Sequence, residues 1–464
     1  MSLDDFCYEE KLPFVKYLNE KVLLYCITLL AFAGIFLLIW VIQNYTFFEK
    51  AKILRGSLPK LPYGNLNNVV NKDNTIYEML WKNYNRFKRK QCDIGGVFFF
   101  TKPVVVVVKP EYIQEVLDNS DNFKQVFPEQ VSQNIGEIFT SNSANSFIQK
   151  YRESLRGVLS EKLQNYDFST VLRSHLLEMA SLAFGLNSPS LVEEINHILK
   201  AKTDAKLKYH LGLCYPLLKS RNSSLYRNLN SLFVDITQAR KTNDNSYDDI
   251  IQYFMDFQRK SSTEPKIISR ILFDLYADVL THTYSVVFAC FCELSKNEDV
   301  QDELLGEIRR YNKKHSVMDI DSLKELEYLN AVVLETLRKY PPVPFILKIA
   351  QKDFTLNNVQ FPKGVLTAIS ILGIHRNPDN YTNPEDFDPD RFAEQTNSAF
   401  LPFGNKIEEN VFKLVVLFTK LLIIDTLTAL KVSRKNDSNA VLKFDRNLIP
   451  LRLSESYLLT FENL

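Results

Sequence analysis

An uncharged apolar run lies close to the start of the chain. Residues 22–42 (VLLYCITLLAFAGIFLLIWVI) carry no charge and reach the length of about 20 residues that a helix needs to cross a bilayer. Trp40 and Tyr45 lie near its far end, where interfacial aromatic residues belong. A signal peptide fits less well, because the run follows acidic sequence and lacks a small-residue cleavage site. The pattern therefore predicts a single-pass membrane anchor.

The charges on either side of this run predict its orientation. Acidic residues precede it and basic residues follow it: Asp4, Asp5, Glu9 and Glu10 before, and Lys50, Lys52, Arg55 and Lys60 after. Because basic flanks stay on the cytoplasmic side, residues 1–21 are expected to be a short lumenal N-terminus and the bulk of the chain to be cytoplasmic. The LPKLPYG stretch at 58–64 is stiff and turn-prone. Residues 43–66 are therefore expected to form a basic, proline-containing linker.

A second apolar run, residues 269–295, is hydrophobic almost all round, which is typical of a long helix inside a core. Asp274, Asp278 and His282 recur every fourth residue, with Thr281 and Ser285 beside them, and mark one polar stripe. Two aspartates make a second membrane span expensive. Asp278 and His282 have the helical spacing of two metal ligands, but the sequence offers no third ligand near them.

Shorter patterns predict further helices and a small amount of sheet. The apolar runs Val97–Phe100 and Val104–Val108 are short and rich in β-branched or aromatic residues, which favours two strands. Pro110 suits the first turn of the helix that follows them. Helical periodicity appears in several other segments, namely residues 75–90, 145–164, 411–430 and, between polar loops, 165–265. The chain is expected to be mainly helical.

Composition narrows the class of protein. The formal net charge of +1 argues against a nucleic-acid-binding surface, so no nucleic-acid partner is expected. The six cysteines form no CxxC ladder and no dense framework, which is typical of a reducing compartment. Cys290 and Cys292 fall in the second apolar run and are predicted core residues, and no cysteine follows Cys292.

A succession of short motifs fills the C-terminal half. Glu335 and Arg338 share one face of a predicted helix and can pair, and the YPP sequence at 340–342 then ends that helix. Further motifs follow in order: PKG at 362–364, HRNP at 375–378, FDPDRF at 387–392 and FLPFG at 400–404. In this order the motifs resemble the C-terminal half of a cytochrome P450, and the resemblance extends from about Leu58 onward.

The resemblance implies the cytochrome P450 fold, which is mainly α with small β-sheets, here behind an N-terminal transmembrane helix. It implies a cytochrome P450-like, catalytic-type domain over residues 67–464. The family activity is haem-dependent monooxygenation of lipophilic small molecules, with electrons from NADPH-cytochrome P450 reductase. The implied location is the endoplasmic reticulum membrane, with the globular domain on the cytoplasmic side of the lipid bilayer.

Matching the family's motifs residue by residue gives a candidate site. Glu335, Arg338 and Arg391 match a buried glutamate and two arginines that form a structural network. On the helix that crosses the distal face of the haem, the proton-delivering threonine matches Thr281 and the glycine that makes room for oxygen matches Asp278. These two are the candidate catalytic residues. The candidate cofactor-binding residues are Arg152 and Arg156, at the two positions of a W-x-x-x-R motif that reaches a haem propionate, Lys348, in place of a propionate-contacting arginine, and Phe403, which opens the ligand loop.

The ligand loop departs from the family pattern F-x-x-G-x-R-x-C-x-G. From Phe403 the chain reads FGNKIEENVF, so Asn410 stands at the position of the thiolate cysteine that binds the metal. Lys406, Glu408 and Phe412 stand for the first glycine, the arginine and the second glycine. Thiolate donation favours O–O cleavage at such an iron, and a neutral amide cannot supply it.

Three interpretations follow from this loop. The first is an active microsomal monooxygenase, as the family implies. The second is a non-catalytic relative that binds a lipid, a protein partner or, weakly, haem. The third is a defective gene model of an active enzyme, with a misassembled exon around codons 400–415.

Overall fold

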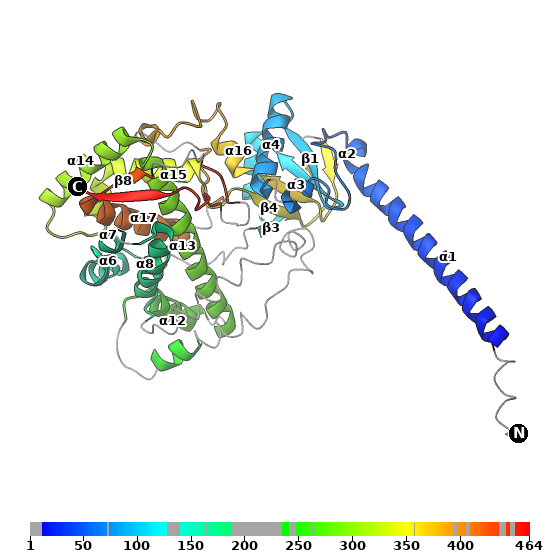
Figure 1. The fold of residues 1–464 in the computed structure, drawn as a ribbon, viewed down its shortest axis with the longest axis horizontal. Helices are drawn as coiled ribbons and strands as arrows, with labels where there is room; N and C mark the ends of the chain where they lie inside the picture. Colours follow the sequence, from blue (N-terminus) through cyan, green and yellow to red (C-terminus); the bar gives the residue numbers. More distant parts are fainter. Residues whose placement is uncertain are drawn as a thin grey trace, which may run out of the picture.

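The computed structural model shows a β-rich part and a larger helical part side by side, with helix α1 projecting from the β-rich end (Figure 1). The C-terminus lies at the opposite end, among the helices (Figure 1). The structure describes residues 12–71, 74–127, 140–163, 166–186, 234–240, 247–261, 264–356, 358–393, 398–404, 409–435, 442–445 and 451–464.

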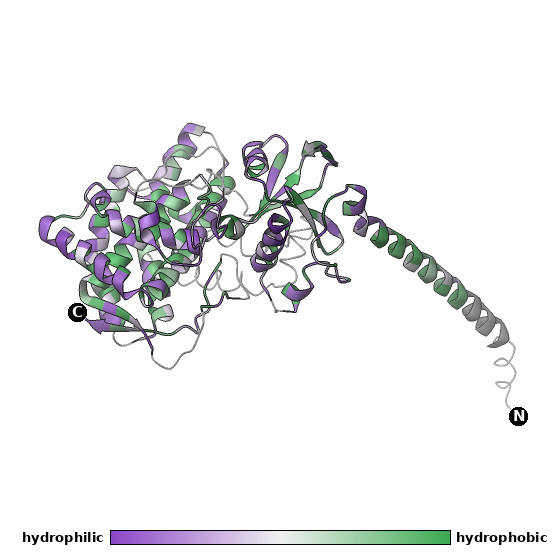
Figure 2. Ribbon diagram, turned by 90° about the horizontal axis from the view of Figure 1, so that it is seen from above, coloured by the Kyte–Doolittle hydropathy of each residue, from purple (hydrophilic) through white to green (hydrophobic). Residues whose placement is uncertain are grey.

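Helix α1 (Leu12–Tyr45) contains the predicted anchor. Over Val22–Tyr45 its mean hydropathy is 2.8 and 0% of the residues are buried in the domain, and Figure 2 shows the part of α1 nearer the domain mostly in the hydrophobic colour. Helix α13 (Pro265–Leu294) is also long and apolar enough to cross a membrane, over Ile267–Leu294, but 89% of the residues in its apolar 18-residue window are buried. Thus α1 is the candidate transmembrane helix, and α13 is a core helix.

The remaining described helices surround α13 or flank the sheet. They are α2 (Phe47–Lys50), α3 (Asn67–Val70), α4 (Ile76–Arg89), α5 (Pro110–Asp118), α6 (Ser141–Ser154), α7 (Val158–Leu163), α8 (Phe168–Phe184), α12 (Ile250–Ser261), α14 (Glu298–Lys314), α15 (Glu327–Lys339), α16 (Ile371–His375) and α17 (Glu409–Ala429), with short 3-10 helices η2 (Ser322–Glu325) and η3 (Pro389–Phe392). Helix α13 packs on α8, α15 and α17. The core therefore centres on α13.

The main sheet has five strands in the order β1-β2-β7-β4-β3. Their bounds are β1 (Ile94–Phe99), β2 (Lys102–Val107), β3 (Phe123–Phe127), β4 (Ile346–Ala350) and β7 (Leu366–Ile369). Strand β2 pairs antiparallel with β1 and parallel with β7. The valines Val104–Val107 are all fully buried, which is why this strand is a continuous apolar run rather than an alternating one. Two small sheets pair β5 (Phe354–Leu356) with β6 (Val359–Phe361) and β8 (Leu430–Arg434) with β9 (Leu459–Asn463).

Part of residues 43–66, the predicted linker, lies against the main sheet. The Tyr45 hydroxyl donates to the Phe100 carbonyl at 3.0 Å. The Phe48 side chain is fully buried on Gly96, where an added Cβ would come within 2.5 Å of the ring. Burying a phenylalanine stabilises by about 1.5–3 kcal/mol, so this segment is held on the domain.

The single helix expected over 145–164 is instead two helices, α6 and α7, separated by a turn at Leu155–Gly157. Gly157 has a positive φ of 81°, and its N–H donates to Asp425 Oδ1 at 2.8 Å. The Tyr151 hydroxyl donates to the other carboxylate oxygen at 3.2 Å. The buried Asp425 carboxylate on α17 therefore stabilises the turn between the two helices. The local pattern of apolar residues does not predict this turn.

Candidate functional site

A buried ion-pair network joins α15 to the segment around η3. Arg338 Nε and Nη2 donate to the two carboxylate oxygens of Glu335 at 2.6 and 2.8 Å, and both side chains are 0% exposed. The Asp388 N–H donates to Glu335 Oε1 at 3.0 Å, and Arg391 Nε lies 3.5 Å from the same oxygen. Such bidentate, charge-assisted contacts are strong and geometrically specific.

His375 links this network to the FLPFG segment at 400–404. Arg338 Nη1 donates to the His375 carbonyl at 2.9 Å, and His375 Nδ1 lies 2.9 Å from the Arg338 carbonyl, which can only accept. Nε2 of the same ring then accepts from the Leu401 N–H at 2.8 Å. Burial lowers the pKa of His375 to about 3, so the ring is neutral and both of its nitrogens are bonded.

The two candidate catalytic residues lie on the half-buried side of α13. The Thr281 hydroxyl donates to the Ala277 carbonyl at 2.8 Å, so its proton is bonded within its own helix. Asp274 lies one turn before Asp278 on the same stripe, and its Oδ2 atom lies 3.6 Å from Arg270 Nε. Both of these contacts lie within α13.

His282 is the side chain that α13 directs toward the FLPFG segment. Its ring lies 5.5 Å from the Phe403 ring in a T-shaped arrangement, and both residues are buried. Burial, with the Arg452 charge nearby, lowers the pKa of His282 to about 3. The sequence placed His282 in a polar stripe and beside Asp278 as a possible metal ligand, but it did not predict the contact with Phe403. One sequence signal could have predicted that His282 points inward. The residues at helical spacing on its face of the helix are apolar and buried: Val279, Val286 and Ala289.

The expected metal-ligand position is on the first turn of α17. Asn410 is half-buried there, while residues 405–408, which include Lys406 and Glu408, lie outside the described residues. Phe403 lies 5.7 Å from the Phe412 ring of α17. A Cβ on Gly404 would come within 2.7 Å of Ile346 Cδ1, so the backbone entering the loop is tight against β4.

Two of the three cations matched to propionate-binding positions bond to other parts of this chain. Lys348 Nζ donates to the Val116 and Leu117 carbonyls at 2.7 and 2.9 Å, near the C-terminal end of α5, where a cation is favourable. Burial lowers the pKa of Lys348 to about 8. Arg152 Nη2 donates to a loop carbonyl, that of Ser316, at 3.1 Å. Arg156 is exposed in the turn after α6.

The residues gathered here do not fit a haem-thiolate centre. Asn410 replaces the cysteine, and the two elements implied to face opposite sides of the macrocycle touch through His282 and Phe403. A flat ring between two side chains holds their facing atoms about 7 Å apart, at about 3.5 Å per side. Rings centred 5.5 Å apart in a T shape are in direct contact.

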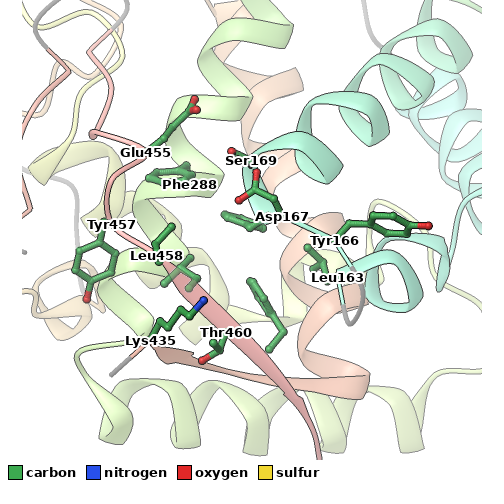
Figure 3. Close-up of a pocket in the computed structure, with 13 residues that line it drawn as sticks. Leu163, Tyr166, Asp167, Ser169, Phe288, Lys435, Glu455, Tyr457, Leu458 and Thr460 are labelled. Atoms are coloured by element: carbon green, nitrogen blue, oxygen red, sulfur yellow. Dashed lines mark hydrogen bonds between the residues drawn. The ribbon is translucent and has the colours of Figure 1, made fainter. Parts of the chain in front are cut away.

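A surface cavity of about 340 Å³ lies apart from these residues, between the turn before α8, α13 and β9 (Figure 3). Phe168, Phe288 and Phe461 line it, and Lys435 and Glu455 lie at opposite sides of it (Figure 3). Glu455 is already bonded to the Tyr284 hydroxyl at 2.7 Å and to Arg173. None of the residues matched to the family site lines this cavity.

Comparison with known proteins finds that the chain is similar to cytochrome P450 proteins. The family model described as Cytochrome P450 matches residues 187–405. The chain is 26% identical over 433 residues to Probable cytochrome P450 6a19 of Drosophila melanogaster, covering 79% of this chain and 84% of that protein. It is 23% identical over 401 residues to Cytochrome P450 3A18 of Rattus norvegicus, covering 79% and 77%. It is 24% identical over 421 residues to Cytochrome P450 6B2 of Helicoverpa armigera, covering 78% and 83%.

These likenesses agree with three features already described. The order of motifs from Glu335 to the FLPFG segment is that of the family, and the fold is mostly helical with small sheets. The apolar helix α1 precedes the domain. Together these findings support a microsomal-type cytochrome P450.

Proposed function

We propose that this chain is a membrane-anchored, non-catalytic member of a family whose activity is haem-dependent monooxygenation. Asn410, in place of the thiolate cysteine, carries the proposal, because the thiolate is what favours O–O cleavage at the iron. The last cysteine of the chain, Cys292, is fully buried on α13. Burial raises its pKa well above the usual value, so it stays a neutral thiol. What the chain retains is the family fold on an anchor, which suits binding of a lipid or of a protein partner.

An active microsomal monooxygenase is the second candidate. The intact network of Glu335, Arg338 and Arg391 favours it, since these residues match the family's own pattern. That function would require haem, electrons from NADPH-cytochrome P450 reductase and a lipophilic small-molecule substrate. The chain lacks the thiolate ligand of the iron at position 410, and for this reason the non-catalytic function is preferred.

Enzyme turnover separates these two functions. The purified full-length protein, placed in lipid vesicles with NADPH-cytochrome P450 reductase, is expected to leave NADPH oxidation at the rate of the reductase alone. Asn410→Cys is expected to give no gain, because Lys406, Glu408 and Phe412 still replace the glycines and the arginine of the loop. A cytochrome P450 of known turnover serves as the positive control. Product formation by the unmodified chain would return it to the active monooxygenases.

We further propose that α1 spans the endoplasmic reticulum membrane, with the domain on the cytoplasmic side. The exposed apolar surface of Val22–Tyr45 supports the span. The basic residues that follow it, such as Lys50 and Arg55, support the orientation.

Removing residues 1–43 is expected to move the protein from the carbonate-resistant membrane pellet toward the soluble fraction. This cut spares Tyr45 and Phe48, which pack on the sheet, so the domain keeps its own contacts. Removing residues 1–11 alone spares the span and should leave the protein in the pellet. Release of the full-length protein by alkaline carbonate would contradict the anchor.

A further inference from the structure

We propose that the domain folds around an interior closed by its own side chains and reaches its stable state without haem. The inference rests on the proposed non-catalytic function and extends it. A chain can lack the thiolate and still bind haem by another ligand, whereas the contacts described next leave no layer for the macrocycle between α13 and the Phe403 segment.

Three rings in series connect α13 to α17. His282 lies edge-on to Phe403 at 5.5 Å, with an angle of 74° between the ring planes. Phe403 in turn meets Phe412 at 5.7 Å and 80°. Edge-to-face pairs at these distances are a favoured packing of aromatic rings. The helix that would lie on one side of a haem is therefore packed on the segment that would lie on the other.

Hydrogen bonds hold the same segments together. The Ser285 hydroxyl of α13 donates to the Leu451 carbonyl, and the Leu451 N–H donates to the Pro342 carbonyl at 3.2 Å. The next residue after Pro342, Val343, donates its N–H to the Pro402 carbonyl at 3.3 Å. Opening the space between His282 and Phe403 would strain this chain of bonds, and leaving buried donors or acceptors unpaired is costly.

His282 also provides the strongest competing possibility. Its ring is buried, and Nδ1 has no hydrogen-bond partner in the part of the chain that the structure describes. A neutral imidazole with a free nitrogen is a potential iron ligand. The competing outcome is thus a haem held by His282 instead of a thiolate, and the experiment must separate it from a closed interior.

The first experiment varies the supply of haem. The full-length protein is produced in haem-limited and in haem-supplemented cells, and the purified samples are compared for haem per chain and for the midpoint of thermal unfolding. Because a group that binds only the folded state raises its stability, a haem-dependent fold would unfold at a lower temperature in the haem-limited sample. We expect the same midpoint in both samples and no stoichiometric haem in either.

The second experiment tests the closing contact by a double-mutant cycle. His282→Ala and Phe403→Ala are expected to change the unfolding constant non-additively, by at least about fivefold, because residues in contact couple. The matched control combines His282→Ala with Phe354→Ala, since Phe354 packs on Phe123 and Phe361 instead; this pair should be additive. If the alanine variants fail to fold, His282→Leu keeps an apolar group of similar size and should unfold at or above the temperature of the unmodified chain.

Each possible result either supports or overturns the proposal of a closed, haem-free interior. Additive effects of His282→Ala and Phe403→Ala would overturn the closed interior. Stoichiometric haem without a thiolate-type spectrum, lost in His282→Leu, would overturn it while leaving the non-catalytic function in place. Stoichiometric haem with a thiolate-type spectrum would overturn both. Haem-free protein with an unchanged midpoint and a coupled pair is the result that we expect.

Discussion

Replacing Glu335 by alanine is expected to lower the free energy of unfolding by about 3–5 kcal/mol, the cost of breaking a buried ion pair from one side. The variant leaves Arg338, which is fully buried, without the carboxylate that takes two of its donors. It also removes the acceptor of the Asp388 N–H and the partner of Arg391. Chemical denaturation of the purified protein measures the loss.

An exposed pair with the same spacing is the matched control. Asp321 and Lys324 also lie three residues apart, with Nζ to Oδ1 at 2.7 Å, but their side chains are 78% and 71% exposed. Asp321→Ala should change stability by no more than about 1 kcal/mol. If Glu335→Ala is as mild as Asp321→Ala, the network does not lock α15 to the η3 segment.

Lowering the pH from 7 to 5 is expected to remove about 6 kcal/mol of stability. His175, His282 and His375 are buried, and burial lowers their pKa values from 6.5 to about 4, 3 and 3. Below pH 6.5 the unfolded chain therefore binds protons that the folded chain does not, so stability falls as the pH falls. Over about 1.5 pH units this amounts to about 2 kcal/mol per histidine, at about 1.36 kcal/mol per unit.

The charges that face these rings act mostly in the same direction. Lys162 near His175, Arg452 near His282, and Arg338 and Arg376 near His375 all disfavour the protonated ring. Asp425 acts the other way, because burial raises the pKa of its carboxyl, and protonation at acid pH then favours the folded state.

Denaturation midpoints at pH 7 and pH 5 measure this effect. His282→Leu should reduce the loss between the two values by about one third, or about 2 kcal/mol. His315→Leu is the control, since that ring lies beside Glu325 at the surface, and it should not reduce the loss. Equal stability of the unmodified protein at pH 7 and pH 5 would show that the buried rings do not resist protonation.

Sequence patterns predicted the elements whose cause is local. The capping box of α4, in which Thr75 and Glu78 bond to each other's backbone N–H, begins that helix one residue after the predicted start at 75. The apolar runs at 97–100 and 104–108 became β1 and β2 with shifted ends. Helix α13 was predictable because its own side chains are apolar nearly all round.

What sequence patterns missed depends on partners far along the chain. The break between α6 and α7 is stabilised by Asp425 of α17, which accepts the Gly157 N–H. The packing of the segment after α1 depends on Gly96, because only a residue without a Cβ leaves room for the Phe48 ring. Lys348 was matched to a propionate contact by its place in a motif, and the bonds of its ammonium group to the end of α5 were not predicted. His282 was taken as one end of a polar stripe, while its row of buried apolar neighbours decides where it points.

The central claim is that this chain forms no haem-thiolate centre, and the carbon monoxide difference spectrum of the reduced, purified protein tests it most directly. Total haem is determined on the same full-length sample, so that a missing band can be related to the haem content. With Asn410 at the ligand position and no other cysteine after Cys292, we predict no thiolate-type band. A stoichiometric thiolate-type band from the unmodified chain would contradict the account.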